Sequence, residues 1–158
     1  MIYILTFLVS STFIWIGTRE CTKRKMEDGM WETVRLKKIP VLIGLLLPAL
    51  LASMRAVSVG SDVSFYVVPL FNKAINSNSF SYYVAILGGD INDIGYCLLN
   101  YIISRFTTEI GWLFFATELI IVFFTFAGCW KLRGKAYPWL SMLFFYFLFY
   151  IVYTKTIY

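Results

Sequence analysis

The sequence predicts an all-α, polytopic membrane protein with about four transmembrane helices, and two observations carry this prediction. The mean hydropathy of the 158 residues is +0.73 and 59% of them are hydrophobic, which is more apolar surface than one soluble core hides. A helical span needs about 17 to 25 apolar residues, and the chain has four such runs that are nearly free of charge. We interpret residues 1–158 as a single membrane domain whose spans are approximately residues 1–18, 39–54, 110–130 and 136–154.

The four runs differ in composition. Residues 1–18 are uncharged, lack a basic n-region and end without a small-residue cleavage site, so we expect a membrane anchor rather than a cleaved signal peptide. Residues 39–54 are leucine-rich and just shorter than a usual span, residues 110–130 contain one carboxylate, Glu118, and residues 136–154 are strongly aromatic. Because the last run ends close to the end of the chain, we expect the sequence to be the N-terminal portion of a longer protein, truncated at its C-terminus.

The distribution of Lys and Arg predicts the orientation of the spans. The connections 19–38 and 131–135 hold ten of the fourteen basic residues, and both lie on the same side of the membrane if four spans alternate. The cytoplasmic side keeps the positive excess, so residues 55–109 and both chain ends are predicted to be extracytoplasmic. The formal net charge of +5 therefore reflects topology, and we expect no nucleic-acid partner.

Composition also limits the chemistry. The chain has no histidine, which excludes imidazole catalysis and His-ligated zinc within it. Cys21 is predicted inside, Cys97 outside and Cys129 within a helix, so neither a disulfide nor a metal site is expected. Acid–base chemistry would fall to carboxylates, Tyr or Lys, and we expect no cofactor.

The first half of the segment 55–109 holds three candidate residues. Arg55 follows the second span, where its guanidinium either anchors at the headgroups or turns toward a cavity. Gly60 permits a tight turn, and Asp62 either caps the apolar piece that follows or accepts a proton. In that piece we expect Pro69 to interrupt any helix. Short apolar pieces of this kind predict helices that lie in the interface or re-enter part-way.

Residues 93–107 have helical periodicity. Asp93, Tyr96, Asn100 and Thr107 fall on one polar stripe, which places a carboxylate, a phenol and an amide in line. Such a line suits the hydroxyl groups of a sugar. The alternative is a surface helix with a wet outer face, N-capped by Asp90 or Asp93. The residues on another side of the helix are Ile94, Leu98, Tyr101, Ile102 and Arg105.

Glu118 lies inside a predicted span, roughly 12 Å below its outer end at about 1.5 Å per residue. A carboxylate at this depth is a functional candidate by default. The structural alternatives are a protonated Glu bonded to a neighbouring helix and an ion pair that orients an Arg.

The order of these motifs resembles a known family. Arg55, the run Gly60-Ser61-Asp62, Tyr66 and Phe71, and then the run Asp93-Ile94-Gly95-Tyr96 with Leu99, all lie between the second and third predicted spans. In this pattern the chain resembles the EpsG-like, Wzy-type polymerases of bacterial exopolysaccharide and capsule assembly. It has Ser61 where the family usually has Thr, and Asp93 where the family usually has Glu, which shortens the carboxylate reach by one methylene. Family members also run to roughly twice this length, with many spans.

The resemblance implies a site at the outer face of the bacterial cytoplasmic membrane, where a glycan on undecaprenyl pyrophosphate is transferred to the next lipid-linked repeat unit. Arg55 would bind the pyrophosphate, and Asp62 or Asp93 would act as general base or acceptor clamp. Tyr66, Tyr96 and Asn100 would bind the sugars, Gly60 and Gly95 would have structural roles, and no metal is implied. The expected partners are the lipid-linked glycan, the bilayer, a flippase and a chain-length regulator.

Two other functions remain open at this point. The first is a non-catalytic transport or assembly component of a polysaccharide locus, in which Arg55 and Glu118 pair to fix helix packing. The second is an inactive fragment of such a polymerase.

Overall fold

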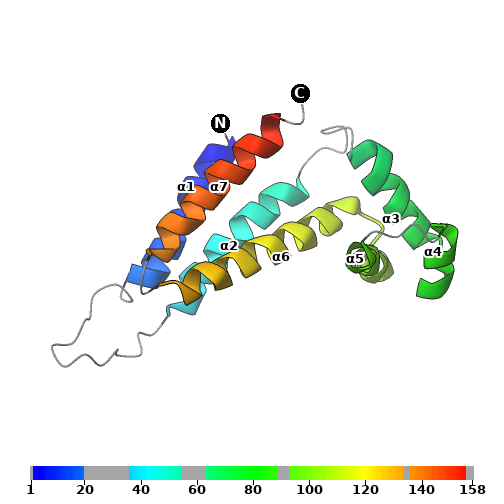
Figure 1. The fold of residues 1–158 in the computed structure, drawn as a ribbon, viewed down its shortest axis with the longest axis horizontal. Helices are drawn as coiled ribbons and strands as arrows, with labels where there is room; N and C mark the ends of the chain where they lie inside the picture. Colours follow the sequence, from blue (N-terminus) through cyan, green and yellow to red (C-terminus); the bar gives the residue numbers. More distant parts are fainter. Residues whose placement is uncertain (1, 20–35, 55–62, 89–92, 134–135, 156–158) are drawn as a thin grey trace. The chain divides into compact units, whose positions relative to one another are not determined.

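A computed structural model of the chain describes residues 2–19, 36–54, 63–88, 93–133 and 136–155, the last of these with side chains as far as residue 148. Within these ranges the regular elements are all helices, as the sequence predicted (Figure 1). In chain order they are α1 (Ile2–Thr18), α2 (Lys38–Ser53), the π-helix η2 (Val63–Val67), α3 (Val68–Ile75), α4 (Phe80–Ile86), α5 (Ile94–Phe106), α6 (Ile110–Lys131) and α7 (Pro138–Lys155).

The helices belong to two compact units. The apolar unit comprises Met1–Leu51 and Thr117–Thr156, and the polar-segment unit comprises Ala52–Ala116. The apolar unit therefore holds α1, α7 and most of α2 and α6, whereas η2, α3, α4 and α5 lie in the polar-segment unit.

Four helices coincide with the four predicted apolar runs to within two residues at each end. Among the described helices, α6 alone is long and apolar enough to cross a bilayer, judged by its 22 residues and their composition. Only 17% of its most apolar window is buried in the protein, which distinguishes it from the core helix of a soluble domain. That α1, α2 and α7 also cross the membrane stays a prediction.

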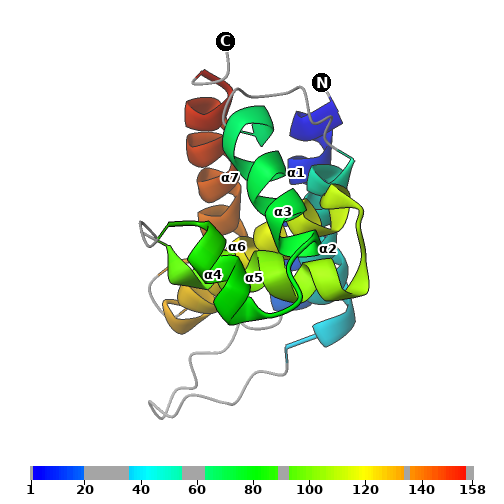
Figure 2. The same cartoon turned by 90° about the vertical axis from the view of Figure 1, so that its right-hand side faces the viewer.

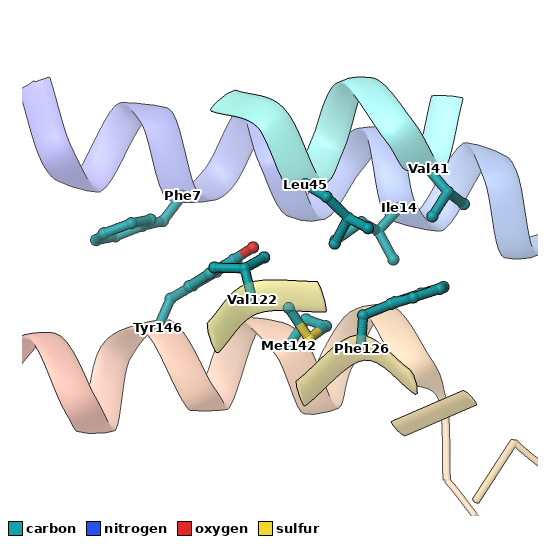
Figure 3. Close-up of a cluster of buried hydrophobic side chains, with 8 residues drawn as sticks. All are labelled: Phe7, Ile14, Val41, Leu45, Val122, Phe126, Met142 and Tyr146. Atoms are coloured by element: carbon teal, nitrogen blue, oxygen red, sulfur yellow. The ribbon is translucent and has the colours of Figure 1, made fainter. Parts of the chain in front are cut away.

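The apolar unit has a core to which all four of its helices contribute (Figure 3). Helices α1 and α7 pack against each other (Figure 1; Figure 2 gives the view turned by 90°), with the rings of Phe7 and Tyr146 stacked 4.8 Å apart. The eight buried residues of this core are Phe7, Ile14, Val41, Leu45, Val122, Phe126, Met142 and Tyr146.

A small residue and a hydroxyl group join α1 to α2. Ser10 Oγ donates to the carbonyl oxygen of Gly44 at 2.7 Å and lies 3.0 Å from the Tyr146 hydroxyl, so one side chain connects three helices. A Cβ on Gly44 would lie 2.8 Å from Ile14 Cγ1 and 2.9 Å from the carbonyl oxygen of Ser10. Glycine thus permits the close backbone approach that is typical of helix pairs in membranes.

The polar-segment unit has a small core of its own around Tyr83 of α4. This side chain is fully buried against Ala74 of α3 and Cys97 of α5, and its ring stacks on Tyr101 at 6.2 Å. Its hydroxyl donates to the carbonyl oxygen of Leu70 at 3.3 Å. Three short helices that would be marginal alone are in this way held together by one aromatic side chain.

Local sequence explains where α4 begins and ends. Ser79 caps its N-terminus by accepting a hydrogen bond from the Tyr82 amide at 3.2 Å. At the other end Gly88 adopts φ +79°, in the left-handed region that favours glycine after the last helical turn.

The prediction that Pro69 interrupts the helix is wrong. The chain passes from η2 directly into α3, and Pro69 lies in the first turn of α3. Proline is tolerated there because its missing amide hydrogen would have no partner within α3, while the wider π-helical turn precedes it.

Candidate functional site

Part of the predicted site falls outside the described residues, namely Arg55, Gly60, Ser61 and Asp62. The remaining candidates are Tyr66 on η2, Asp93, Gly95, Tyr96 and Asn100 at or on α5, and Glu118 on α6.

The polar stripe predicted for residues 93–107 lies along one side of α5 and turns inward over most of its length. Asp93 is exposed, Tyr96 and Thr107 are half-buried, and Asn100 is fully buried. The alternative of a surface helix with a wet outer face is therefore contradicted at Asn100, which packs into the polar-segment unit. Burying polar groups needs hydrogen-bond partners, which makes Tyr96 and Asn100 the most constrained candidates.

Tyr96 and Asn100 interact one helical turn apart. Asn100 Nδ2 donates to the Tyr96 carbonyl oxygen at 2.8 Å, whereas Asn100 Oδ1 has no hydrogen-bond partner among the described residues. Burial raises the pKa of the Tyr96 phenol, and the Asn100 side chain partly offsets the rise. At neutral pH the phenol thus keeps its proton and can donate a hydrogen bond, whereas Asn100 Oδ1 lies buried within the unit.

Asp93 occupies the N-cap position of α5, as one alternative predicted. Its carbonyl oxygen accepts from the Tyr96 and Cys97 amides, both at 3.1 Å. The carboxylate itself makes no capping hydrogen bond and is exposed. It is therefore available to a substrate, as a general base requires.

Tyr66 is not joined to these α5 residues in the described parts of the chain, and Glu118 belongs to the apolar unit. Tyr66 is 73% exposed on η2, and the structure shows no hydrogen bond or ring contact between it and Asp93, Tyr96 or Asn100. Glu118 is half-buried on α6 in the apolar unit, and no ion pair with a described Lys or Arg is seen. The Arg55–Glu118 pair stays a hypothesis, since Arg55 lies outside the described residues.

Arg105 is a residue whose contacts the sequence did not reveal. Its Nη2 donates to the carbonyl oxygens of Ala74 and Ile75, the latter at 3.2 Å, and its guanidinium lies 4.7 Å from the centre of the Tyr101 ring. A cation at the C-terminal end of α3 also complements the helix dipole. Arg105 therefore ties α5 to α3. The sequence placed Arg105 in the last turn of a predicted helix, where a basic side chain usually interacts with the last carbonyl groups of its own helix. In the structure Arg105 binds the end of α3 instead.

Together these features define a class. A strongly apolar helix with most of its surface unburied, in a chain whose described elements are all helices, characterises a helical membrane protein. The chain belongs to the EpsG family, whose family model matches residues 38–157, a range that begins with α2 and includes every later described helix. Comparisons with curated proteins and with solved structures gave no match. The resemblance found in the sequence is confirmed.

Gly95 offers a test of whether α5 serves only to hold the fold. An added Cβ on Gly95 would meet nothing within 4 Å, and the residue lies in the first turn of α5. Gly95→Ala is therefore expected to leave thermal stability unchanged or to raise it, by up to about 1 kcal/mol. If Gly95 instead leaves room for a substrate, the variant will keep its stability in detergent and lose polymer length in cells.

Proposed function

We propose that the protein is a membrane polysaccharide polymerase of exopolysaccharide or capsule biosynthesis. It is a glycosyltransferase that acts on undecaprenyl-pyrophosphate-linked repeat units at the outer face of the bacterial cytoplasmic membrane. The observation that carries the proposal is membership of the EpsG family over residues 38–157, which points to an exopolysaccharide-related polymerase.

The proposed placement has four spans, α1, α2, α6 and α7, with the N-terminus outside. The basic connections 19–38 and 131–135 face the cytoplasm, as their ten Lys and Arg residues favour. Residues 55–109 are then extracytoplasmic, with short helices that lie in the interface or re-enter it. A flippase that delivers repeat units and a regulator of chain length are the partners that such a reaction needs.

The proposed step is a glycosyl transfer. A hydroxyl of the acceptor sugar attacks the anomeric carbon of the growing glycan, a new C–O bond forms, and the C–O bond to pyrophosphate breaks. Undecaprenyl pyrophosphate departs with the bonding electrons, and Arg55 stabilises its charge through paired N–H donors. The hydroxyl proton passes to Asp62 or Asp93.

Sugar binding falls to the phenols. The Tyr96 hydroxyl donates to a sugar hydroxyl, and the buried Asn100 amide supports the turn of α5 that carries Tyr96, through its 2.8 Å hydrogen bond to the Tyr96 carbonyl oxygen. Tyr66, exposed on η2, would contact a sugar ring with its apolar face.

Single alanine replacements of Arg55, Asp62 and Asp93 in the full-length protein test these roles. We expect Arg55→Ala and at least one of the two Asp variants to lose long polymer, because a missing general base costs about 10²- to 10⁴-fold in rate. The measurement is the length distribution of extracted polysaccharide at matched protein levels. Glu109→Ala is the matched control, since Glu109 is an exposed carboxylate of the same unit that lies outside the proposed site. Normal long polymer in all three variants would remove the catalytic assignment.

A further inference from the structure

The outward face of α5 is apolar. Ile94, Leu98, Ile102 and Phe106 follow one another at intervals of four residues and are 63%, 44%, 44% and 83% exposed. We call these four residues the apolar stripe of α5. On the inward face Asn100 and Ser104 are buried. A helix that covers the core of a water-soluble protein has the opposite arrangement, with its apolar face buried and its polar face exposed.

The apolar stripe continues onto the first turn of α6. Phe106, the last residue of the stripe, and Trp112 of α6 line one hollow of about 450 Å³ together with Ile103 and Thr107. Only three residues, Thr107 to Glu109, separate the two helices. Trp112 is 58% exposed at the start of the helix best suited to cross a bilayer, where tryptophan marks the membrane–water interface.

We propose that α5 is an in-plane membrane helix whose apolar stripe is inserted among the acyl chains of the outer leaflet. The occupant is lipid because the stripe is continuous with the start of a membrane-competent helix. Amphipathic helices of this kind bury their apolar face about 5–10 Å into the boundary between headgroups and chains.

The charges near the stripe fit this orientation. Arg105 is next to Phe106, but its guanidinium is bound to the carbonyl oxygens of Ala74 and Ile75 on α3, so it adds no free charge to the stripe. Asp93, at the other end, projects from the polar stripe. The inference rests on the membrane placement of the proposed function and not on its chemistry. Insertion of the stripe would hold the Asp93 end of α5 at the depth of a lipid-linked pyrophosphate.

Site-directed spin labelling in vesicles of phosphatidylethanolamine and phosphatidylglycerol tests the proposal. In a variant with Cys21, Cys97 and Cys129 replaced by alanine, single labels are placed by Leu98→Cys and, separately, Ile102→Cys. Lys73→Cys on α3 is the control, because Lys73 is exposed in the same unit but lies outside the stripe. Phe124→Cys on α6, 68% exposed, is the reference for the membrane span.

We expect both stripe labels to resemble the Phe124 label, with a ratio of oxygen to nickel-chelate accessibility several-fold above that of the Lys73 label. Stripe labels that collide mainly with the aqueous nickel chelate would overturn the proposal. So would immobile labels inaccessible to both reagents, which would show that a second copy or another protein covers the stripe. If the Phe124 label also fails to contact lipid, the proposed membrane span itself is wrong, which separates the two failures.

Discussion

Replacing Tyr83 with alanine is expected to unfold the polar-segment unit. The side chain is fully buried, stacks on Tyr101 and bonds to the carbonyl oxygen of Leu70, so its removal leaves a cavity where α3, α4 and α5 meet. Truncation of a buried aromatic residue costs about 3–5 kcal/mol, which is a large share of the stability of so small a unit. Polymer length should fall as well, because α5 carries the candidate residues.

Cys97 provides the readout, since it is 5% exposed and packs against Tyr83. Burial, followed by the nearby Asp93 carboxylate, raises the pKa of the Cys97 thiol above its ordinary value of 9.0, so little thiolate is present at neutral pH. In a background without Cys21 and Cys129, maleimide labelling of Cys97 should be slow in the parent and fast in Tyr83→Ala. Tyr83→Phe is the control, because it keeps the buried ring and loses only the hydroxyl group, at a cost of about 1 kcal/mol per hydrogen bond. Equal labelling rates in the parent and Tyr83→Ala would refute this description of the core.

The second large effect is expected from Gly44→Val in the apolar unit. The new side chain would begin 2.8 Å from Ile14 and 2.9 Å from the carbonyl oxygen of Ser10, so α1 and α2 must move apart. Overpacking of this kind costs about 1–3 kcal/mol, and the separation also breaks the hydrogen bond between Ser10 and Gly44. We expect a lower melting temperature in detergent and less protein in the membrane fraction.

Gly128→Ala is the matched control for that experiment. Gly128 also lies in an apolar helix, but an added Cβ there meets nothing within 4 Å. Its melting temperature should equal that of the parent or exceed it. If Gly44→Val melts as the parent does, α1 and α2 do not pack closely at Gly44.

The sequence predicted the helices well because their signals are local. Long runs nearly free of charge located α1, α2, α6 and α7 to within two residues, and periodicity separated the polar and apolar sides of α5. Periodicity alone could not decide which side faces the protein. A polar stripe usually faces water, and here Asn100 is buried while Ile94 and Phe106 are exposed.

Interactions between residues far apart in the chain could not be predicted from the sequence. Arg105 binds carbonyl groups about thirty residues earlier in the chain, and such acceptors are present on every helix. The role of Tyr83 depends on three short helices meeting around it. The prediction that Pro69 interrupts the helix was wrong because the π-helical turn before it accommodates the ring. No residue pattern in the sequence indicated that turn.

The most direct test of the proposed polymerase is transfer by the purified full-length protein in liposomes supplied with the lipid-linked repeat unit of its own locus. We expect a ladder of lengthening glycans on the lipid carrier, lost in Arg55→Ala and retained in Glu109→Ala. Undiminished single repeat units in the presence of folded, membrane-inserted protein, with no ladder at any substrate concentration, would contradict it.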